Sequence, residues 1–356
     1  MNSTEEDIIF IKNHLLPELV YERCFCDVGS REFVEYDSAS VKIPNTKPTN
    51  NDESHYLVDV VVKFSGEPKN FPLFIKLLAV TVNDVTYNWF LNEEIFYNSH
   101  LIRKSVNNLK IIPKCYAVSM GKYGRPVLVL EDLSTQNFLK IEKLNFQELN
   151  LCARAIGLFH EGILKYVKEK NTSLNNFTTL QIMETNQDFE KGFSRIKSLV
   201  DSKILAKILN TLGDNDVVDY LKSSIIREQK ILCHGNFSGQ NLLFRYENGI
   251  AVDVKAIRWH TIKYSSIGMD LACIIFENLS KEMGDIDDIF TRYLDAVKSG
   301  YLENERNSPS LTEVRSAFVS NLLYAYFTLS LDENCSDEKI VALSEQLERF
   351  GAFSAT

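Results

Sequence analysis

The sequence lacks three features that would assign the chain to a special class of protein. None of its apolar runs approaches the roughly 18 residues of a membrane span, and the N-terminal stretch MNSTEEDIIFIKNHLL is acidic, unlike a signal peptide. Basic residues are not in excess, because 39 Lys and Arg stand against 48 Asp and Glu, for a net charge of −9. A general nucleic-acid binder needs a basic face. We therefore expect no membrane span, no nucleic-acid partner and a cytoplasmic location.

Cysteine spacing gives no sign of a metal site or of a disulfide framework. The seven cysteines are odd in number, and Cys24 and Cys26 form the only close pair. Their one-residue gap matches no common zinc or redox spacing. We interpret the cysteines as buried free thiols. Hydrophobic residues at 45% and charged residues at 24% are otherwise ordinary for a globular protein with a large core.

Strand-forming residues gather in the first third of the chain, and helical periodicity prevails from about residue 145. Runs rich in β-forming residues predict five strands, at 33–43, 56–64, 71–80, 111–118 and 126–130. A single helix is expected between the third and fourth strands. This order predicts a two-lobed, protein-kinase-like α+β fold, with an antiparallel sheet plus helix in an N-lobe at 1–132 and a mainly helical C-lobe at 133–356.

The stretch at 231–260, ILCHGNFSGQNLLFRYENGIAVDVKAIRWH, is predicted to be a polar loop followed by two strands. In the loop, the sequence His234-Gly235-Asn236 is followed five residues later by Asn241. A kinase catalytic loop has this layout, with an Asp that orients the acceptor hydroxyl and a downstream Asn that holds a metal ion. The second strand should deliver a metal-binding Asp, but the residue there is Arg258. The pattern indicates a phosphotransferase frame that lacks two acidic groups.

Lys76 is a lone charge inside the apolar run PLFIKLL. Burying a charge is costly unless it is paired, and Glu93 or Glu94 in the following helical segment could supply the partner. Alternatively, the strand lies at an edge of the sheet and the ammonium reaches solvent. The residues alone leave both alternatives open.

Short motifs spread over nearly the whole chain resemble those of one family. They are PLFIKLL, EEIFY, IIPKCYAV, VLVLEDLS, IGLFH, LCHGNFSGQN and VDVKAIRWHTIKYSSIGMDLACIIF. In order and spacing they are similar to the ecdysteroid kinase-like (choline kinase-like, CHK) small-molecule kinases of insects, relatives of choline kinases and aminoglycoside phosphotransferases. The resemblance implies a kinase-like fold, ATP as the cofactor, and phosphoryl transfer to a hydroxyl of a small molecule such as an ecdysteroid.

The resemblance also implies roles for residues of the N-lobe. Lys76 would contact the nucleotide phosphates and pair with Glu93. Glu131, Asp132 and Leu133 would form the hinge that meets adenine through backbone groups.

Three residues of the C-lobe receive roles in the same way. Asn241 would be a magnesium ligand, and Asp270 would bond the backbone of the catalytic loop. His234 would pack and hydrogen-bond beneath the site rather than act as a base.

Two departures from the family pattern concern the chemistry itself. Asn236 stands in place of the catalytic Asp, and an amide cannot accept the substrate's hydroxyl proton, a contribution typically worth about 10²–10⁴ in rate. Arg258 stands in place of the metal-binding Asp, and guanidinium has no lone pair for Mg²⁺ and repels it. Asp253, five residues earlier on the same strand, is expected to point to the opposite face. Mg²⁺ binding is therefore disfavoured.

A third departure lies in the loop expected to cover the nucleotide phosphates. The stretch from Asn50 to Ser54 contains no glycine, so backbone amides cannot approach a phosphate as closely as in relatives. Asp52 and Glu53 would oppose the phosphate charge.

Three functions remain open. The leading hypothesis is a catalytically impaired pseudokinase that binds a small molecule, a nucleotide or a protein partner. The alternatives are a slow ATP-dependent kinase of a small hydroxylated molecule and a structural interaction protein that binds no nucleotide. Arg258 either neutralises phosphate directly, since guanidinium pairs with phosphate oxygens, or pairs with a neighbouring carboxylate and fills the metal site.

Overall fold

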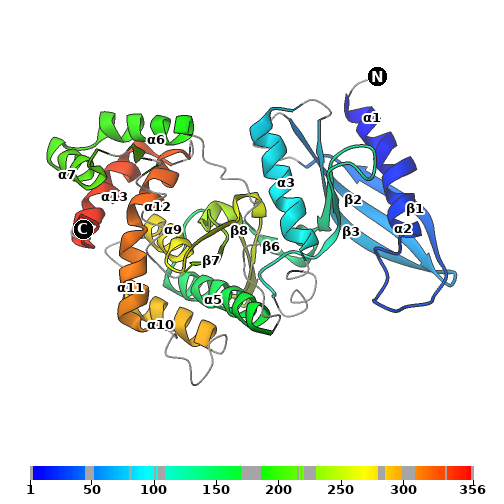
Figure 1. Ribbon diagram of the computed structural model, residues 1–356. Coiled ribbons are helices and arrows are strands. Elements are labelled where there is room, and N and C mark those ends of the chain that lie inside the picture. The colour runs from blue at the N-terminus through cyan, green and yellow to red at the C-terminus, as the bar shows by residue number, and fades with distance from the viewer. Residues whose placement is uncertain are drawn as a thin grey trace. The chain divides into compact units, whose positions relative to one another are not determined.

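The chain divides into two compact units, which are described separately below. The sheet unit comprises Met1–Arg103 and Pro113–Phe138, and the helical unit comprises Lys104–Ile112 and Leu139–Thr356. Their antiparallel strands and many helices (Figure 1) confirm the predicted α+β class. This computed structural model describes residues 3–44, 52–79, 82–99, 102, 109–169, 186–214, 216–217, 219, 230–279, 285–298, 309–332 and 335–353.

The sheet unit is built on a five-stranded antiparallel sheet with the strand order β1-β2-β3-β5-β4. All five predicted strands are present: β1 (Val34–Lys42), β2 (Glu53–Phe64), β3 (Glu67–Leu78), β4 (Cys115–Ser119) and β5 (Val127–Glu131). Strand β3 is central, with β2 on one side and β5 on the other. Lys76 lies in the second half of β3, where both neighbours pair with the strand, and has no route to solvent at a sheet edge.

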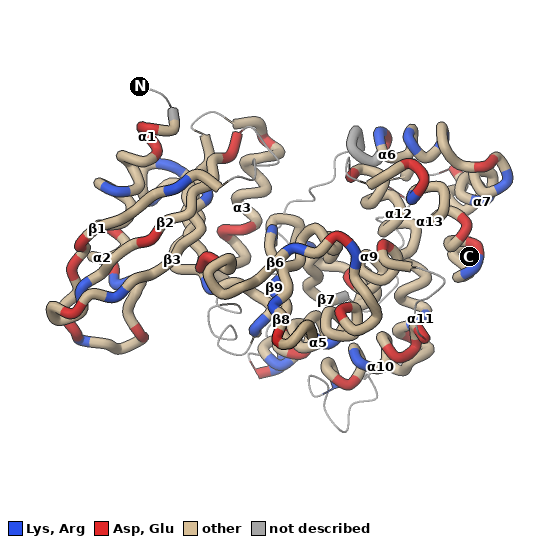
Figure 2. The backbone as a smooth tube through the Cα atoms, turned by 180° about the vertical axis from the view of Figure 1, so that it is seen from behind, with Lys and Arg blue, Asp and Glu red and all other residues tan. Residues whose placement is uncertain are grey.

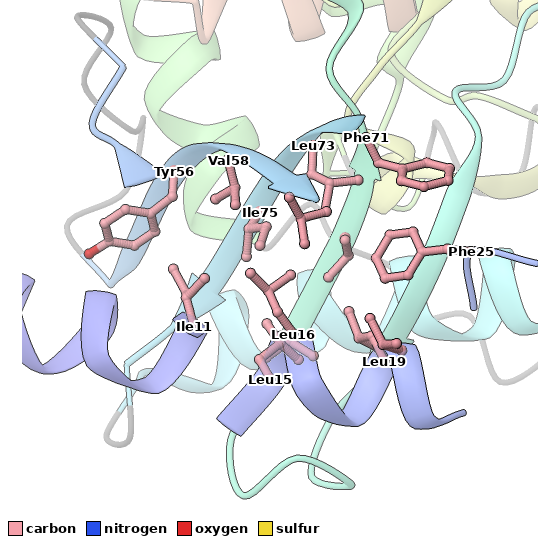
Figure 3. Close-up of a cluster of buried hydrophobic side chains, with 14 of the residues drawn as sticks. Ile11, Leu15, Leu16, Leu19, Phe25, Tyr56, Val58, Phe71, Leu73 and Ile75 are labelled. Atoms are coloured by element: carbon pink, nitrogen blue, oxygen red, sulfur yellow. The ribbon is translucent and has the colours of Figure 1, made fainter. Parts of the chain in front are cut away.

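The two faces of this sheet have different covers. On one face, an N-terminal helix packs over apolar side chains of β2, β3 and β5 (Figure 3). This helix consists of α1 (Ser3–Phe10), the π-helical η1 (Ile11–Leu15) and α2 (Leu16–Tyr21). Leu73, Ile75 and Leu77 of β3 lie in that cluster. Because side chains alternate along a strand, Lys76 lies on the other face, toward helix α3 (Asp84–Asn98).

The helical unit surrounds two small antiparallel strand sets. Strands β7 and β10 pair with each other, and β8 and β9 form a hairpin that β6 joins. Its strands are β6 (Phe138–Leu139), β7 (Lys230–Cys233), β8 (Leu242–Glu247), β9 (Ile250–Ala256) and β10 (Lys263–Ser266). Its helices are α5 (Phe146–Glu169), α6 (Asn186–Leu199), α7 (Ser202–Leu212), α9 (Met269–Glu277), α10 (Ile286–Val297), α11 (Leu311–Ser320), α12 (Leu322–Ser330) and α13 (Asp337–Arg349).

Helix α9 forms the centre of the helical unit. Every residue from Met269 to Phe276 is buried, and α5 and α12 pack against the helix. A helix that is apolar on all sides belongs in a core, and α9 places the carboxylate of Asp270 there. None of the described helices combines the length with the apolar composition that a bilayer crossing demands.

All seven cysteines are free thiols, as expected, but not all are buried. Cys152, Cys233, Cys273 and Cys335 are buried, whereas Cys24, Cys26 and Cys115 are partly exposed. The prediction of burial is therefore wrong for the last three, which lie in the smaller sheet unit. Acidic and basic residues are interspersed along both units (Figure 2), as is typical of a solvated surface.

Candidate functional site

Lys76 carries the buried positive charge of the sheet unit. Its Nζ lies 2.5 Å from Glu93 Oε2 and 3.3 Å from Glu53 Oε1, and only 6% of the residue is exposed. Burial alone would lower the pKa of Lys76, but the charges of Glu93 and Glu53 outweigh burial and raise this pKa above its ordinary value. The ion pair with Glu93 forms as expected, and the alternative of a solvent-exposed edge lysine is wrong.

Glu53 is the partner that the sequence analysis missed. It was expected in a loop facing phosphate, but it is the first residue of β2, whose His55 lies directly opposite Lys76 across the sheet. Glu53 and His55 share the Lys76 face because side chains alternate. Glu53 Oε2 lies 3.2 Å from His55 Nε2. This contact depends on the strand register, which is not visible in the sequence, and residues 50–51 of the predicted loop lie outside the described part.

The predicted hinge residues follow the end of β5. The N–H of Glu131 donates to the carbonyl of Lys114 at 2.9 Å, and the N–H of Asp132 donates to the carbonyl of Pro72 at 3.0 Å. The carboxylate of Asp132 caps the short 3₁₀ helix η2 (Leu133–Gln136) by accepting the N–H of Ser134. Two of the three hinge N–H groups are therefore engaged within the sheet unit.

In the helical unit, the loop after β7 is anchored by the buried carboxylate of Asp270. The N–H of His234 donates to Asp270 Oδ2 at 2.9 Å, and the N–H of Gly235 donates to Oδ1 at 3.0 Å. Gly235 has φ +85°, and a Cβ there would lie 2.1 Å from the carbonyl oxygen of Thr261. Only glycine fits this position. Asp270 and Gly235 together fix the path of this loop.

Both ring nitrogens of His234 have hydrogen-bond partners within the helical unit. Nε2 lies 3.0 Å from the carbonyl oxygen of Ile257, so this nitrogen carries the proton and donates. Nδ1 accepts from the N–H of Asn236 at 3.4 Å. Burial lowers the pKa of His234 despite the opposing charge of Asp270, which keeps the imidazole neutral. His234 therefore packs beneath the loop, as expected.

Asn241 offers a single oxygen to a metal ion. Its Nδ2 donates to the carbonyl of Asn236 at 2.8 Å, while its buried Oδ1 has no hydrogen-bond partner within the described ranges. Mg²⁺ requires six oxygen ligands, and its protein ligands are usually carboxylates. The position expected to supply a metal-binding carboxylate holds Arg258, and the position expected to supply the proton-accepting carboxylate holds Asn236. This donor set does not fit Mg²⁺.

Arg258 lies two residues after the end of β9 and has a left-handed backbone, with φ 62° and ψ 52°. It is half-buried, and no Asp or Glu of the described chain forms an ion pair with it. Asp253 instead pairs with Arg245 at 3.4 Å. The interpretation that a neighbouring carboxylate neutralises Arg258 therefore finds no support among these residues.

A small cavity of about 10 Å³ lies beside the loop in the helical unit. It has room for a group of about one water molecule. Glu277 reaches it from the end of α9, and its Oε2 accepts the N–H of Gly239 at 2.8 Å. Burial raises the pKa of Glu277, against the effect of that hydrogen bond. The lining residues are Asn236, Ser238, Gln240, Cys273, Glu277, Ala325, Thr328 and Leu329.

A second set of metal-binding residue types lies deeper in the core. His160, Cys233 and Asp270 are all buried, and their ligand atoms lie within 4.8 Å of one another. Each has a structural role already: His160 Nδ1 lies 2.8 Å from the hydroxyl of Tyr293, the Cys233 thiol donates to the carbonyl of Ser266, and Asp270 anchors the loop. These contacts account for the group without a metal.

Solved structures with a similar fold include three phosphotransferases. A choline kinase from Cryptosporidium parvum Iowa II is 12% identical, with a TM-score of 0.47, over 98% of this chain and 94% of that one. A Plasmodium vivax ethanolamine kinase is 14% identical, with a TM-score of 0.41, over 87% and 80% of the two chains. Aminoglycoside 2'-phosphotransferase-IIIa, solved with GDP, is 11% identical, with a TM-score of 0.43, over 96% and 99%.

A search of curated proteins gave no match. The sequence does match the ecdysteroid kinase-like family, over residues 57–304, which is more than half of the chain. The matched range includes Lys76, Glu93 and the whole loop from His234 to Asn241. The chain belongs to the ecdysteroid kinase-like family.

Proposed function

We propose that this protein is a catalytically impaired member of its family, which binds a nucleotide or another phosphate-bearing small molecule without efficient phosphoryl transfer. The observation that carries this proposal is the pair of exchanged side chains in the helical unit. Asn236 is an amide where a proton acceptor is needed, and Arg258 is a cation where a metal ligand is needed. Phosphoryl transfer depends on positioning and on charge neutralisation at the phosphates, and both exchanges act on that step.

Retained groups favour binding over the loss of all function. Lys76 remains charged beside Glu93, and Asp270 holds the loop in place. Arg258 has no carboxylate partner in the described part of the chain, and its guanidinium is suited to contact two phosphate oxygens at once. In this proposal Arg258 supplies the positive charge that a metal ion supplies in active relatives.

Binding of ADP to the purified full-length protein, with and without Mg²⁺, tests the first part. We expect ADP to raise the melting temperature equally in both conditions, because the charge comes from arginine. Arg258→Ala should weaken ADP binding by about tenfold, since one charged contact to phosphate is removed. Arg245→Ala is a matched control in the β8–β9 hairpin, where Arg245 is already paired with Glu247 and Asp253.

A transfer assay with Mg-ATP, ecdysone and other steroid alcohols tests the second part. We expect no transfer above the background of an Asn241→Ala variant. Turnover by the wild type that disappears in that variant would overturn the proposal. No melting shift with any nucleotide would instead favour a structural interaction protein.

One observation favours a slow kinase as the second candidate. Glu277 lines the same small cavity as Asn236, and burial raises the pKa of its carboxylate. A carboxylate with a raised pKa is a better proton acceptor near neutral pH. In this candidate Glu277 takes the hydroxyl proton in place of the missing Asp. Residual turnover lost in Glu277→Gln, with ADP affinity unchanged, would establish it.

A further inference from the structure

The carboxylate of Glu53 contacts the Lys76 ammonium at 3.3 Å, in addition to the expected partner Glu93. We propose that Glu53 is a built-in competitor of phosphate, so that a phosphate-bearing ligand engages Lys76 only after Glu53 releases it. This inference rests on the proposed function, because it concerns the same lysine. It adds a control on that site which neither the family nor the exchanged loop residues imply.

Charge within the cluster is the first argument. Lys76 contributes one positive charge, and Glu93 and Glu53 contribute two negative charges, with contacts of 2.5 Å and 3.3 Å. Glu93 alone would form a neutral pair that can still attract an anion through the remaining ammonium protons. Burial and the charge of Glu53 raise the pKa of Glu93, against the effect of Lys76. With both carboxylates ionised and His55 neutral, the second carboxylate makes the group net negative, and like charges oppose the approach of a phosphate.

The second argument is that the position of Glu53 is fixed by two different partners. Oε1 contacts Lys76, and Oε2 lies 3.2 Å from Nε2 of His55. The side chains of Lys76, Glu53 and His55 are only 7%, 8% and 17% exposed. In such surroundings water screens the charges weakly, so the contact is stronger than an ion pair at the surface.

The third argument is that Glu53 can move without unfolding the sheet. It is the first residue of β2, and the strand start is held independently by its neighbour Asp52. The carbonyl of Asp52 accepts the N–H of Ala79 at 2.8 Å, and its carboxylate accepts from Asn83 at 2.8 Å. A change of the Glu53 rotamer therefore frees Lys76 while these backbone anchors remain.

Isothermal titration with ADP in the absence of Mg²⁺ tests the proposal. Glu53→Gln removes the charge and keeps the shape, and we expect it to bind ADP about tenfold more tightly than the wild type. Adenosine, which has no phosphate, should bind both proteins equally. Asp59→Asn makes the same charge change farther along β2, where Asp59 pairs with exposed Lys42 at 3.8 Å, and should match the wild type.

Several results would overturn this role for Glu53. They are equal or weaker ADP binding in Glu53→Gln, the same gain in Asp59→Asn, or an equal gain for adenosine. Glu53→Met, which also lacks the charge, provides the same comparison if the Gln variant does not melt cooperatively. Wild-type turnover, measured in the same preparations, concerns the proposed function alone. The two ideas can therefore fail separately.

Discussion

Carboxylates are distributed oppositely in the two units. In the sheet unit, Lys76 has two acidic partners where one would be enough. In the helical unit, Arg258 has no acidic partner and Asn241 Oδ1 has no hydrogen-bond partner, as far as the described residues extend. In the proposed function, Asn236 stands in place of a catalytic Asp, and Arg258 stands in place of a metal-binding Asp and brings a positive charge.

In the proposed function, this difference separates the scaffold from the chemistry. Contacts that position the backbone are kept in both units, as the Asp270 anchor and the Lys76–Glu93 pair show. The two residues on which the proposed function rests, Asn236 and Arg258, both lie in the helical unit. Phosphate binding by arginine and restraint of the lysine by Glu53 are both consistent with a protein that binds rather than turns over. The predictions below test each side of this comparison.

Lys76→Met should have the largest effect, on the stability of the sheet unit. It leaves the buried carboxylates of Glu93 and Glu53 without their counter-charge, which costs about 3–5 kcal/mol of unfolding free energy. Lys63→Met on neighbouring β2 is the control, because Lys63 also pairs at 2.5 Å with Asp37, but near the surface. Urea denaturation measures both. Equal losses in the two variants would show that burial of the Lys76 cluster has no special effect.

Asp270→Asn should destabilise the helical unit by about 2–4 kcal/mol. The amide oxygen of Asn can accept only one of the two backbone N–H groups, those of His234 and Gly235, that Asp270 accepts. The amide NH₂ then faces the second N–H, so that buried donor loses its partner. Hydrogen exchange of His234 and Gly235 should accelerate with the loss of the anchor. Asp253→Asn, near the surface in the same unit, should leave these amides protected. Unchanged exchange in the Asp270 variant would contradict the anchoring role.

Much of this arrangement could be predicted from the sequence, because local patterns carry it. The five strands follow runs of β-forming residues, whereas the Lys76–Glu93 pair and the Asp270 anchor follow from the resemblance to the family. Glu53 could not be assigned, because its contact depends on the β2–β3 register and on where β2 begins. Glu277 was missed for a similar reason, since only the packing of α9 brings it to the loop.

Restoring the acidic groups should produce a smaller, qualitative change. The Asn236→Asp, Arg258→Asp double variant places the two carboxylates that the family resemblance implies in the same unit as Asn241 Oδ1. We expect Mg²⁺ to strengthen ATP binding by tenfold or more in the double variant and to have no effect in the wild type, measured by titration calorimetry. No gain would mean that the helical unit has changed beyond these two side chains.

Glu277→Gln should have the smallest effect, and its sign depends on pH. Burial raises the pKa of Glu277 above its ordinary value of 4.5, against the hydrogen bond from the Gly239 N–H. A carboxyl group that holds its proton more tightly in the folded protein stabilises the folded state. This stabilisation is complete below about pH 4.5 and is lost as the pH rises through the raised pKa. Glu277→Gln should therefore raise the melting temperature at pH 7 and leave it unchanged near pH 4.

Glu313 is the matched control with the opposite sign. Hydrogen bonds from the backbone N–H and the hydroxyl of Ser310 lower the pKa of Glu313, so its contribution is present at neutral pH and lost in acid. Glu313→Gln should lower the melting temperature at pH 7 only. If Glu277→Gln also lowers it at pH 7, Glu277 is a structural ion. If Glu277→Gln raises the melting temperature at pH 7, Glu277 is a destabilising carboxylate beside Asn236. This is expected for a residue that serves binding or proton transfer.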